Sequence, residues 1–258
     1  MISEPAFTLP RWARVADAAT LALVLLGCSV FIFGGFREAL PFGRLSITSG
    51  FRPLAIASVV LLLRHWAWRE PSVIARAHAI WIKARASAAW RAAWPAFVST
   101  RITVLLVGFF GIALLGYAPN TPPWRVYDND FLNLAARWDT GWYLGIAERG
   151  YRWEPEHASG MQNIAFFPAF PIISYYVSLP MGRQTLWAGV LVSLTAFLIA
   201  LQYLFRFARE KIGDEGASAA VVWIAAYPFA LFFSTAYTES LFLLTAVAAQ
   251  FHPRRRAS

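Results

Sequence analysis

A series of apolar stretches long enough to cross a lipid bilayer constrains this chain more than any other feature. A membrane-spanning helix needs about 20 mainly apolar residues, with a usual range of about 17 to 25. We expect spans at residues 16–35, 53–68, 102–118, 185–205, 217–235 and 240–251. The sequence therefore predicts that residues 1–258 form a single membrane domain with an all-α fold, a polytopic bundle of transmembrane helices.

The composition excludes an ordinary water-soluble fold. Hydrophobic residues make up 58% of the chain and charged residues only 14%, whereas a soluble domain carries about 25% charged residues. The net charge of +9 comes mostly from arginines grouped between apolar stretches, which is typical of cytoplasmic loops and of contacts with membrane lipids rather than with nucleic acid. Cys28 is the single cysteine, so an internal disulfide is excluded, and we expect no metal site because zinc-binding spacings are absent.

The charge distribution predicts the orientation of the chain. From Arg64 to Arg101 there are seven bases and one acid, which places this loop in the cytoplasm. Arg64 itself reads as the snorkelling end of the span at 53–68, and residues 73–94 read as a basic amphipathic helix on the membrane surface. Residues 118–162 hold six acids and four arginines and form the predicted extracytoplasmic loop.

The apolar stretch at residues 163–180 differs from the others because Pro168 and Pro171 interrupt it. The bases after residue 205 and those at the C-terminus can both be cytoplasmic only if this stretch does not cross the membrane fully. We therefore expect residues 163–180 to be interfacial or re-entrant. This topology places the loop at 118–162 and Glu239 on the same outer face, where they could share a site.

The clearest candidate for chemistry is a segment that reads as one amphipathic helix, residues 137–151. Trp138, Trp142 and Gly145 share one face of it, and Gly150 is a suitable helix end. Asp139 lies beside this aromatic face, where a carboxylate can act as a general base and aromatic rings can stack on sugar or lipid. The alternative is that Asp139 only caps the helix N-terminus.

The other ionisable residues have simpler interpretations. Glu239 lies at the bilayer edge, so it is either functional or a cap of the last helix. The remaining candidates are more simply interpreted as residues of turns or of the solvated surface. They are Asp128, Asp130, Glu148, Glu154, Glu156 and His157.

Three motifs together carry a resemblance to a known family. They read Arg137-Trp-Asp-x-x-Trp-Tyr-Leu-x-Ile-Ala-x-x-Gly-Tyr151, then Asn163-Ile-Ala-Phe-Phe-Pro-x-Phe-Pro171, then Ala236-Tyr-Thr-Glu-Ser-Leu241. In this order and spacing they resemble the PIG-V family of mannosyltransferases, which includes GPI mannosyltransferase 2 and bacterial relatives, within the GT-C class of polytopic glycosyltransferases. The resemblance covers residues 119–250.

The resemblance implies an inverting membrane mannosyltransferase with an outer-face active site in the first large loop. The donor would be a polyprenyl-phosphate sugar and the acceptor a lipid or glycan, with no nucleotide sugar and no cofactor. The catalytic residue would be Asp139. The substrate-binding residues would be Trp138, Trp142, Tyr143, Asn163, Phe167, Pro168, Tyr237 and Glu239.

The chain also departs from the family, whose members continue for several more spans. Here a basic tail follows Phe251, so we expect a C-terminally truncated member, either inactive alone or completed by a partner subunit. The alternative from another functional class is a non-catalytic membrane scaffold or a transporter subunit. The expected location is a bacterial plasma membrane, crossed several times.

Overall fold

The computed structural model describes residues 9–40, 43–69, 71–117, 124–153, 155 and 160–251. Within these ranges helices dominate and one two-stranded sheet occurs, which confirms the predicted all-α class. The chain divides into two compact units. The first holds residues 1–85 and 179–183, and the second holds residues 86–178 and 184–258.

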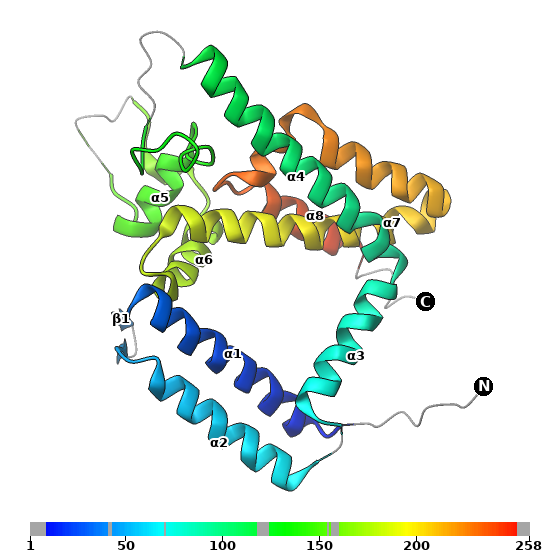
Figure 1. Ribbon diagram of the computed structural model, residues 1–258. Helices are drawn as coiled ribbons and strands as arrows, with labels where there is room; N and C mark the ends of the chain where they lie inside the picture. The colour runs from blue at the N-terminus through cyan, green and yellow to red at the C-terminus, as the bar shows by residue number, and fades with distance from the viewer. Residues whose placement is uncertain are drawn as a thin grey trace. The chain divides into compact units, whose positions relative to one another are not determined.

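The first unit is a helical hairpin closed by a short β-hairpin. Helices α1 and α2 lie side by side (Figure 1), and Gly27 and Gly50 allow this because a Cβ at Gly50 would lie only 2.7 Å from the Gly27 carbonyl oxygen. The antiparallel strands pair Phe36 with Ile47 and were not predicted from the sequence. The elements are α1 (Arg11–Phe33), β1 (Phe36–Leu40), β2 (Gly43–Ile47), α2 (Phe51–Ala67), α3 (Val73–Ala86) and the 3₁₀ helix η3 (Leu179–Met181).

A buried ion pair joins the open ends of this helical hairpin. The Arg64 Nε atom donates to Asp17 Oδ1 at 2.8 Å, and Arg76 pairs with the same carboxylate. Arg64 also donates to the carbonyl oxygens of Trp68 at 2.7 Å and Pro71 at 2.8 Å. The snorkelling interpretation of Arg64 is therefore wrong. The residue is only 2% exposed, and its charge is neutralised by Asp17 inside the unit instead of being solvated by water.

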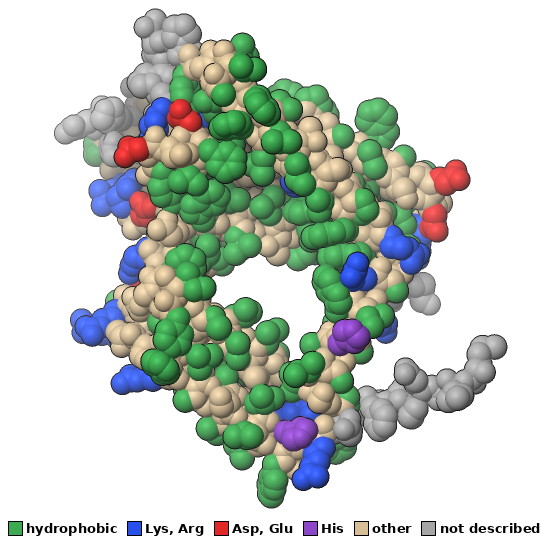
Figure 2. All heavy atoms as spheres, in the orientation of Figure 1, with side chains coloured by type: hydrophobic (Ala, Val, Ile, Leu, Met, Phe, Trp, Pro, Cys, Tyr) green, Lys and Arg blue, Asp and Glu red, His purple; other side chains and the backbone are tan. Residues whose placement is uncertain are grey.

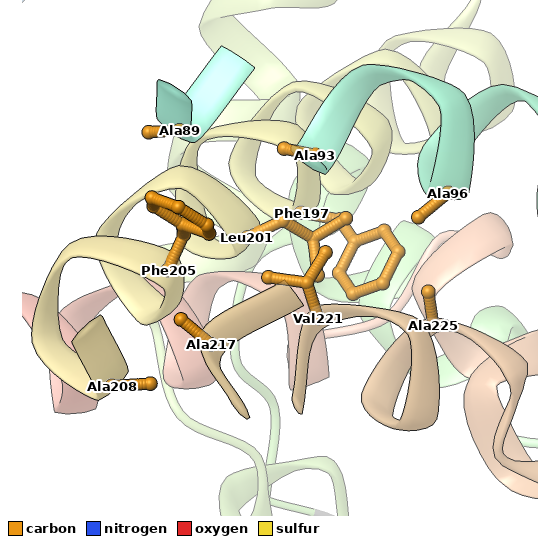
Figure 3. Close-up of a cluster of buried hydrophobic side chains, with 10 residues drawn as sticks. All are labelled: Ala89, Ala93, Ala96, Phe197, Leu201, Phe205, Ala208, Ala217, Val221 and Ala225. Atoms are coloured by element: carbon orange, nitrogen blue, oxygen red, sulfur yellow. The ribbon is translucent and has the colours of Figure 1, made fainter. Parts of the chain in front are cut away.

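The second unit holds the candidate site, and its core lies between α4 and α7. Figure 3 shows Ala89, Ala93 and Ala96 of α4 against Phe197 and Val221 of α7. Alanines at this helical spacing allow two helices to approach closely. The elements are α4 (Ala88–Leu115), α5 (Thr140–Arg149), the 3₁₀ helix η2 (Asn163–Ala165), α6 (Ala169–Ser178), α7 (Thr185–Ala226), the 3₁₀ helix η4 (Pro228–Ser234) and α8 (Glu239–Phe251).

Several helix ends differ from the predicted stretches. The amphipathic stretch at 73–94 is divided at Ser87, whose hydroxyl accepts a hydrogen bond from the Trp90 amide at 3.2 Å and caps α4. Helix α7 contains two predicted stretches, which meet at Gly213 with φ +72°. The second of these ends as a helix at Ala226 because Pro228 begins η4.

Within the residues that the structure describes, three helices are long and apolar enough to cross a membrane, namely α1, α4 and α7. The pair η4 and α8, bent by 98°, would be a fourth if it is one broken span. The proline-containing stretch forms only a short apolar helix over Ala169–Met181. Hydrophobic side chains cover much of the visible surface of each unit (Figure 2), as expected for a membrane protein.

Candidate functional site

A strained turn precedes α5 and sets the position of Asp139. Trp138 has φ +45°, a conformation that non-glycine residues rarely adopt. The helix therefore begins at Thr140 rather than at the predicted residue 137. Its predicted end is confirmed, because Gly150 has φ +75° and its amide donates to the Ile146 carbonyl oxygen at 2.8 Å. Strain of this kind persists only where surrounding contacts hold it.

Tyr237 supplies those contacts from a distant part of the chain. The Asp139 amide donates to the Tyr237 hydroxyl at 2.5 Å, and that hydroxyl donates to the Arg137 carbonyl oxygen at 3.2 Å. The Tyr237 side chain is buried, and its backbone carbonyl accepts a hydrogen bond from Ser193 Oγ at 3.0 Å. The structure thus brings the Asp139 and Tyr237 segments together and clamps the strained turn on both sides of Trp138.

The Asp139 carboxylate is not used as a helix cap. Asp139 occupies the N-cap position of α5, but its side chain makes no capping hydrogen bond. The residue is exposed, and no hydrogen bond or ion pair joins its carboxylate to any residue in the described part of the chain. Capping therefore does not account for an aspartate at this position, and the carboxylate is exposed to solvent.

A polar cleft of about 420 Å³ lies along α5. Trp138, Trp142 and Gly145 contribute to one wall, so they share a face as predicted. In the sequence Asp139 lies between two residues that line the cleft, Trp138 and Gly141, but Asp139 itself is not part of the wall. The cleft is lined by Trp124, Trp138, Gly141, Trp142, Gly145, Arg149, Gly150, Arg152, Met161, Gln162 and Asn163.

Two arginines line this cleft, Arg149, which pairs with Glu148 at 3.3 Å, and Arg152, and neither was predicted from the sequence as a site residue. Arg149 continues the helical face of Trp138 and Trp142 by a further turn, so the same periodicity could have identified it. Arg152 follows the helix end, where Asn163 Oδ1 accepts a hydrogen bond from its amide at 3.0 Å and Asn163 Nδ2 donates to the Gly150 carbonyl oxygen at 3.3 Å. Asn163 therefore lines the cleft and also fixes the end of α5.

A cluster of aromatic rings packs against α5. Trp142 stacks on Phe166 with ring centroids 5.8 Å apart, and Tyr143 meets Phe166 edge-on at 5.1 Å and Tyr237 at 5.6 Å. Phe167 is 77% exposed and Pro168 is also exposed, so the ring packed against α5 is Phe166, which the sequence analysis did not select.

The pKa of Tyr143 reflects the charges around the site. Burial raises the pKa of Tyr143 to about 12, and the negative charges of Glu239, Asp139 and Tyr151 contribute in the same direction. The hydroxyl therefore stays protonated at neutral pH. Both carboxylates act on one tyrosine, which places Glu239 and Asp139 in a common electrostatic environment.

Glu239 is the first residue of α8, and one of its carboxylate oxygens is buried. Its Oε2 atom is buried without a hydrogen-bond partner among the residues that the structure describes. A buried carboxylate oxygen without a partner is costly, which favours the functional interpretation of Glu239 over a purely structural one.

The remaining acids have structural partners or lie outside the described residues. Asp130 pairs with Arg125 at 2.8 Å, while Glu148 accepts a hydrogen bond from the Thr185 hydroxyl at 2.6 Å. Asp128 is exposed in the turn before Phe131. Glu154, Glu156 and His157 lie outside the described residues. Across the described ranges, no three His, Cys, Asp or Glu side chains gather in a group that could hold a metal ion.

Comparison with known proteins gives one family match. A family model described as mannosyltransferase (PIG-V) matches residues 121–258, which include α5, the cleft, Tyr237 and Glu239. A search of the curated proteins and a search of the solved structures each found no match.

Proposed function

Because the chain belongs to the PIG-V mannosyltransferase family, we propose that it transfers mannose from a polyprenyl-phosphate donor to a lipid or glycan acceptor at the outer membrane face. The observation that carries the proposal is the Asp139 turn. An aspartate is held in a strained backbone by Tyr237, its carboxylate is open, and a polar cleft with tryptophan walls begins beside it.

In this proposal Asp139 is the general base. The acceptor hydroxyl attacks the anomeric carbon of mannose and gives its proton to the Asp139 carboxylate. The new oxygen–carbon bond forms as the bond between that carbon and the phosphate oxygen breaks, and the polyprenyl phosphate leaves with the electron pair. Attack from the face opposite the phosphate inverts the anomeric centre. A positioned general base contributes roughly 10²–10⁴-fold to such a step.

The aromatic and polar residues of the site bind substrate. Trp138 and Trp142 stack on sugar rings, and Arg149, Arg152 and Asn163 supply hydrogen bonds in the cleft. Glu239, with its unpaired buried oxygen, accepts a hydrogen bond from donor or acceptor. The resemblance adds Tyr143, Phe167, Pro168 and Tyr237 to the substrate-binding set, although none of these four is among the residues that line the polar cleft.

The proposed topology follows from charge and helix length. The loop at 118–162 and Glu239 face the outside, and the basic residues at 70–100 and 206–214 face the cytoplasm. Single-cysteine labelling in a Cys28→Ser background tests this arrangement. Labelling of a cysteine at position 156 only after the cytoplasmic side is permeabilised would contradict it.

Membranes from cells that express the intact gene test the activity. We expect them to move labelled mannose from polyprenyl-phosphate mannose into a lipid or glycan product, and membranes from cells without the gene to lack this product. Equal incorporation in both would overturn the proposal and favour a non-catalytic membrane protein.

A further inference from the structure

A second cavity of the second unit is apolar and lies along α4. Its volume is about 630 Å³, within the range of about 300–1,000 Å³ that is usual for ligand pockets. We call it the α4 groove. One wall follows α4 from Ser99 to Ile112, with Thr100, Val104 and Gly108 in a row at helical spacing. The other wall comes from residues 225–235.

The dimensions of the α4 groove suit an extended hydrocarbon chain. The stretch of α4 that lines it is about 20 Å long, given a rise of about 1.5 Å per residue. Helix α4 is one of the helices long enough to cross a membrane, so an occupant would reach the groove from the hydrocarbon layer. A sugar ring would gain little from walls of valine, leucine and isoleucine.

The charges around the α4 groove favour an anionic occupant. Arg101 is 5% exposed and donates to the carbonyl oxygens of Ala225 at 2.7 Å and Ala230 at 2.6 Å and to Ser234 Oγ at 2.8 Å. No described residue forms an ion pair with it, and two of its partners, Ala225 and Ser234, line the groove. Arg101 does not line the groove itself and its donors are held by these acceptors, but its positive charge has no carboxylate beside it in the described ranges and makes the groove more favourable for an anion.

A second arginine lies at the end of the groove nearest the site. Arg137 lines the groove, and its Nη2 atom donates to the Tyr117 hydroxyl at 3.1 Å. That hydroxyl donates to Asp130, whose charge is paired with Arg125. No Asp or Glu lines the groove among the described residues. The guanidinium of Arg137 is thus positioned to bind a phosphate group, which arginine recognises well.

Trp138 lines both the α4 groove and the polar cleft. A molecule with its apolar chain in the groove and its phosphate beside Arg137 would present whatever the phosphate carries at Trp138, next to Asp139. We propose that the α4 groove binds the polyprenyl chain of the donor, with its phosphate at Arg137 and its sugar in the polar cleft. This inference rests on the proposed function, because it takes the donor class from there.

Binding of unglycosylated polyprenyl phosphate tests the inference without requiring sugar transfer. The intact protein is placed in phosphatidylcholine nanodiscs, and its affinity for polyprenyl phosphate is compared with that for the matching polyprenyl alcohol and for phosphatidylglycerol. We expect Arg137→Gln to weaken polyprenyl phosphate binding about tenfold or more and to change alcohol binding little, because only the phosphate meets the guanidinium.

Two glycines of the same helix give a matched pair of variants. A Cβ at Gly108 would lie 3.6 Å from Leu134 Cδ2, an ordinary contact, and the rest of a leucine side chain there would extend into the groove that Gly108 lines. A Cβ at Gly111, which does not line the groove, would meet nothing within 4 Å. Both substitutions replace glycine by leucine within α4, so their effects on the helix itself should be similar.

We expect Gly108→Leu to weaken polyprenyl phosphate binding about tenfold, roughly 1.4 kcal/mol, and Gly111→Leu to leave it within about twofold. Equal effects of the two substitutions, or equally tight binding of phosphatidylglycerol, would overturn the inference. Failure of mannose transfer together with groove-dependent lipid binding would overturn the proposed function alone. Transfer that persists while Gly108→Leu leaves lipid binding unchanged would overturn the inference alone.

Discussion

Removal of the Tyr237 hydroxyl group should release the strained turn at Trp138 while leaving the rest of the fold intact. Tyr237→Phe keeps the ring contacts with Tyr143 at 5.6 Å and Phe232 at 5.0 Å. It removes the acceptor for the Asp139 amide and the donor to the Arg137 carbonyl oxygen. The side chain of Tyr237 is buried, so each lost partner costs about 1–3 kcal/mol.

The strained backbone at Trp138 turns this local loss into a loss of activity. A non-glycine residue with positive φ costs about 1–3 kcal/mol and persists only while its surroundings hold it. Without the clamp, the turn should relax and carry the Asp139 carboxylate away from the acceptor. If the variant loses about 1–3 kcal/mol of transition-state stabilisation, kcat should fall by roughly 5- to 150-fold.

The assay is mannose transfer by purified protein, measured as kcat and KM, with the thermal unfolding midpoint recorded in the same detergent. Tyr176→Phe is the matched control, because Tyr176 is half exposed on α6 and its hydroxyl has no hydrogen-bond partner among the described residues, while its ring contacts Tyr175. We expect Tyr176→Phe to be almost silent. A Tyr237→Phe protein with unchanged kcat would refute the clamp, and equal loss of unfolding midpoint and kcat would reduce it to a general packing effect.

Substitutions at three further positions test the cleft wall, the packing of α7 and the role of Arg101. Trp142→Ala should raise KM or lower kcat several-fold while the protein still inserts into the membrane, because Trp142 lines the cleft and is held there by stacking on Phe166; equal loss of insertion would indicate an anchoring role. Gly189→Ala should destabilise the protein by about 1–3 kcal/mol, because its Cβ would lie 2.8 Å from Ala236 Cβ; an unchanged unfolding midpoint would contradict this packing. Arg101→Met should lower the unfolding midpoint by leaving three acceptors unpaired, and Arg101→Lys should recover part of it; equal midpoints for wild type and Arg101→Met would contradict this role.

The sequence predicted the helical class and a helix within 137–151, of which 140–149 is helical, because apolar and aromatic periodicity is a local property. The end at Gly150 followed from the same reasoning, since glycine at a helix end needs only local backbone freedom. The strained start could not be predicted, because the positive φ of Trp138 depends on Tyr237, almost a hundred residues later.

The burial of individual charged and aromatic side chains could not be predicted from the sequence. Arg64 follows an apolar stretch, and hydropathy alone cannot show that Asp17 of another helix neutralises it. The Phe166–Pro171 run presented a related difficulty. Several aromatic rings follow one another there, and only tertiary packing decides that Phe166 contacts Trp142 while Phe167 is exposed.

The central claim is that the open carboxylate of Asp139 removes the acceptor proton, and the turnover of Asp139→Asn measures it most directly. Asparagine keeps the size and the capping ability of aspartate but cannot act as the base. In mannose transfer by the intact protein we predict a fall in kcat of roughly 10²–10⁴-fold, with unchanged expression and unfolding midpoint. Asp128→Asn, an exposed turn residue, should remain near wild type in the same assay. An Asp139→Asn enzyme with near wild-type turnover would contradict the account and leave Asp139 without a catalytic role.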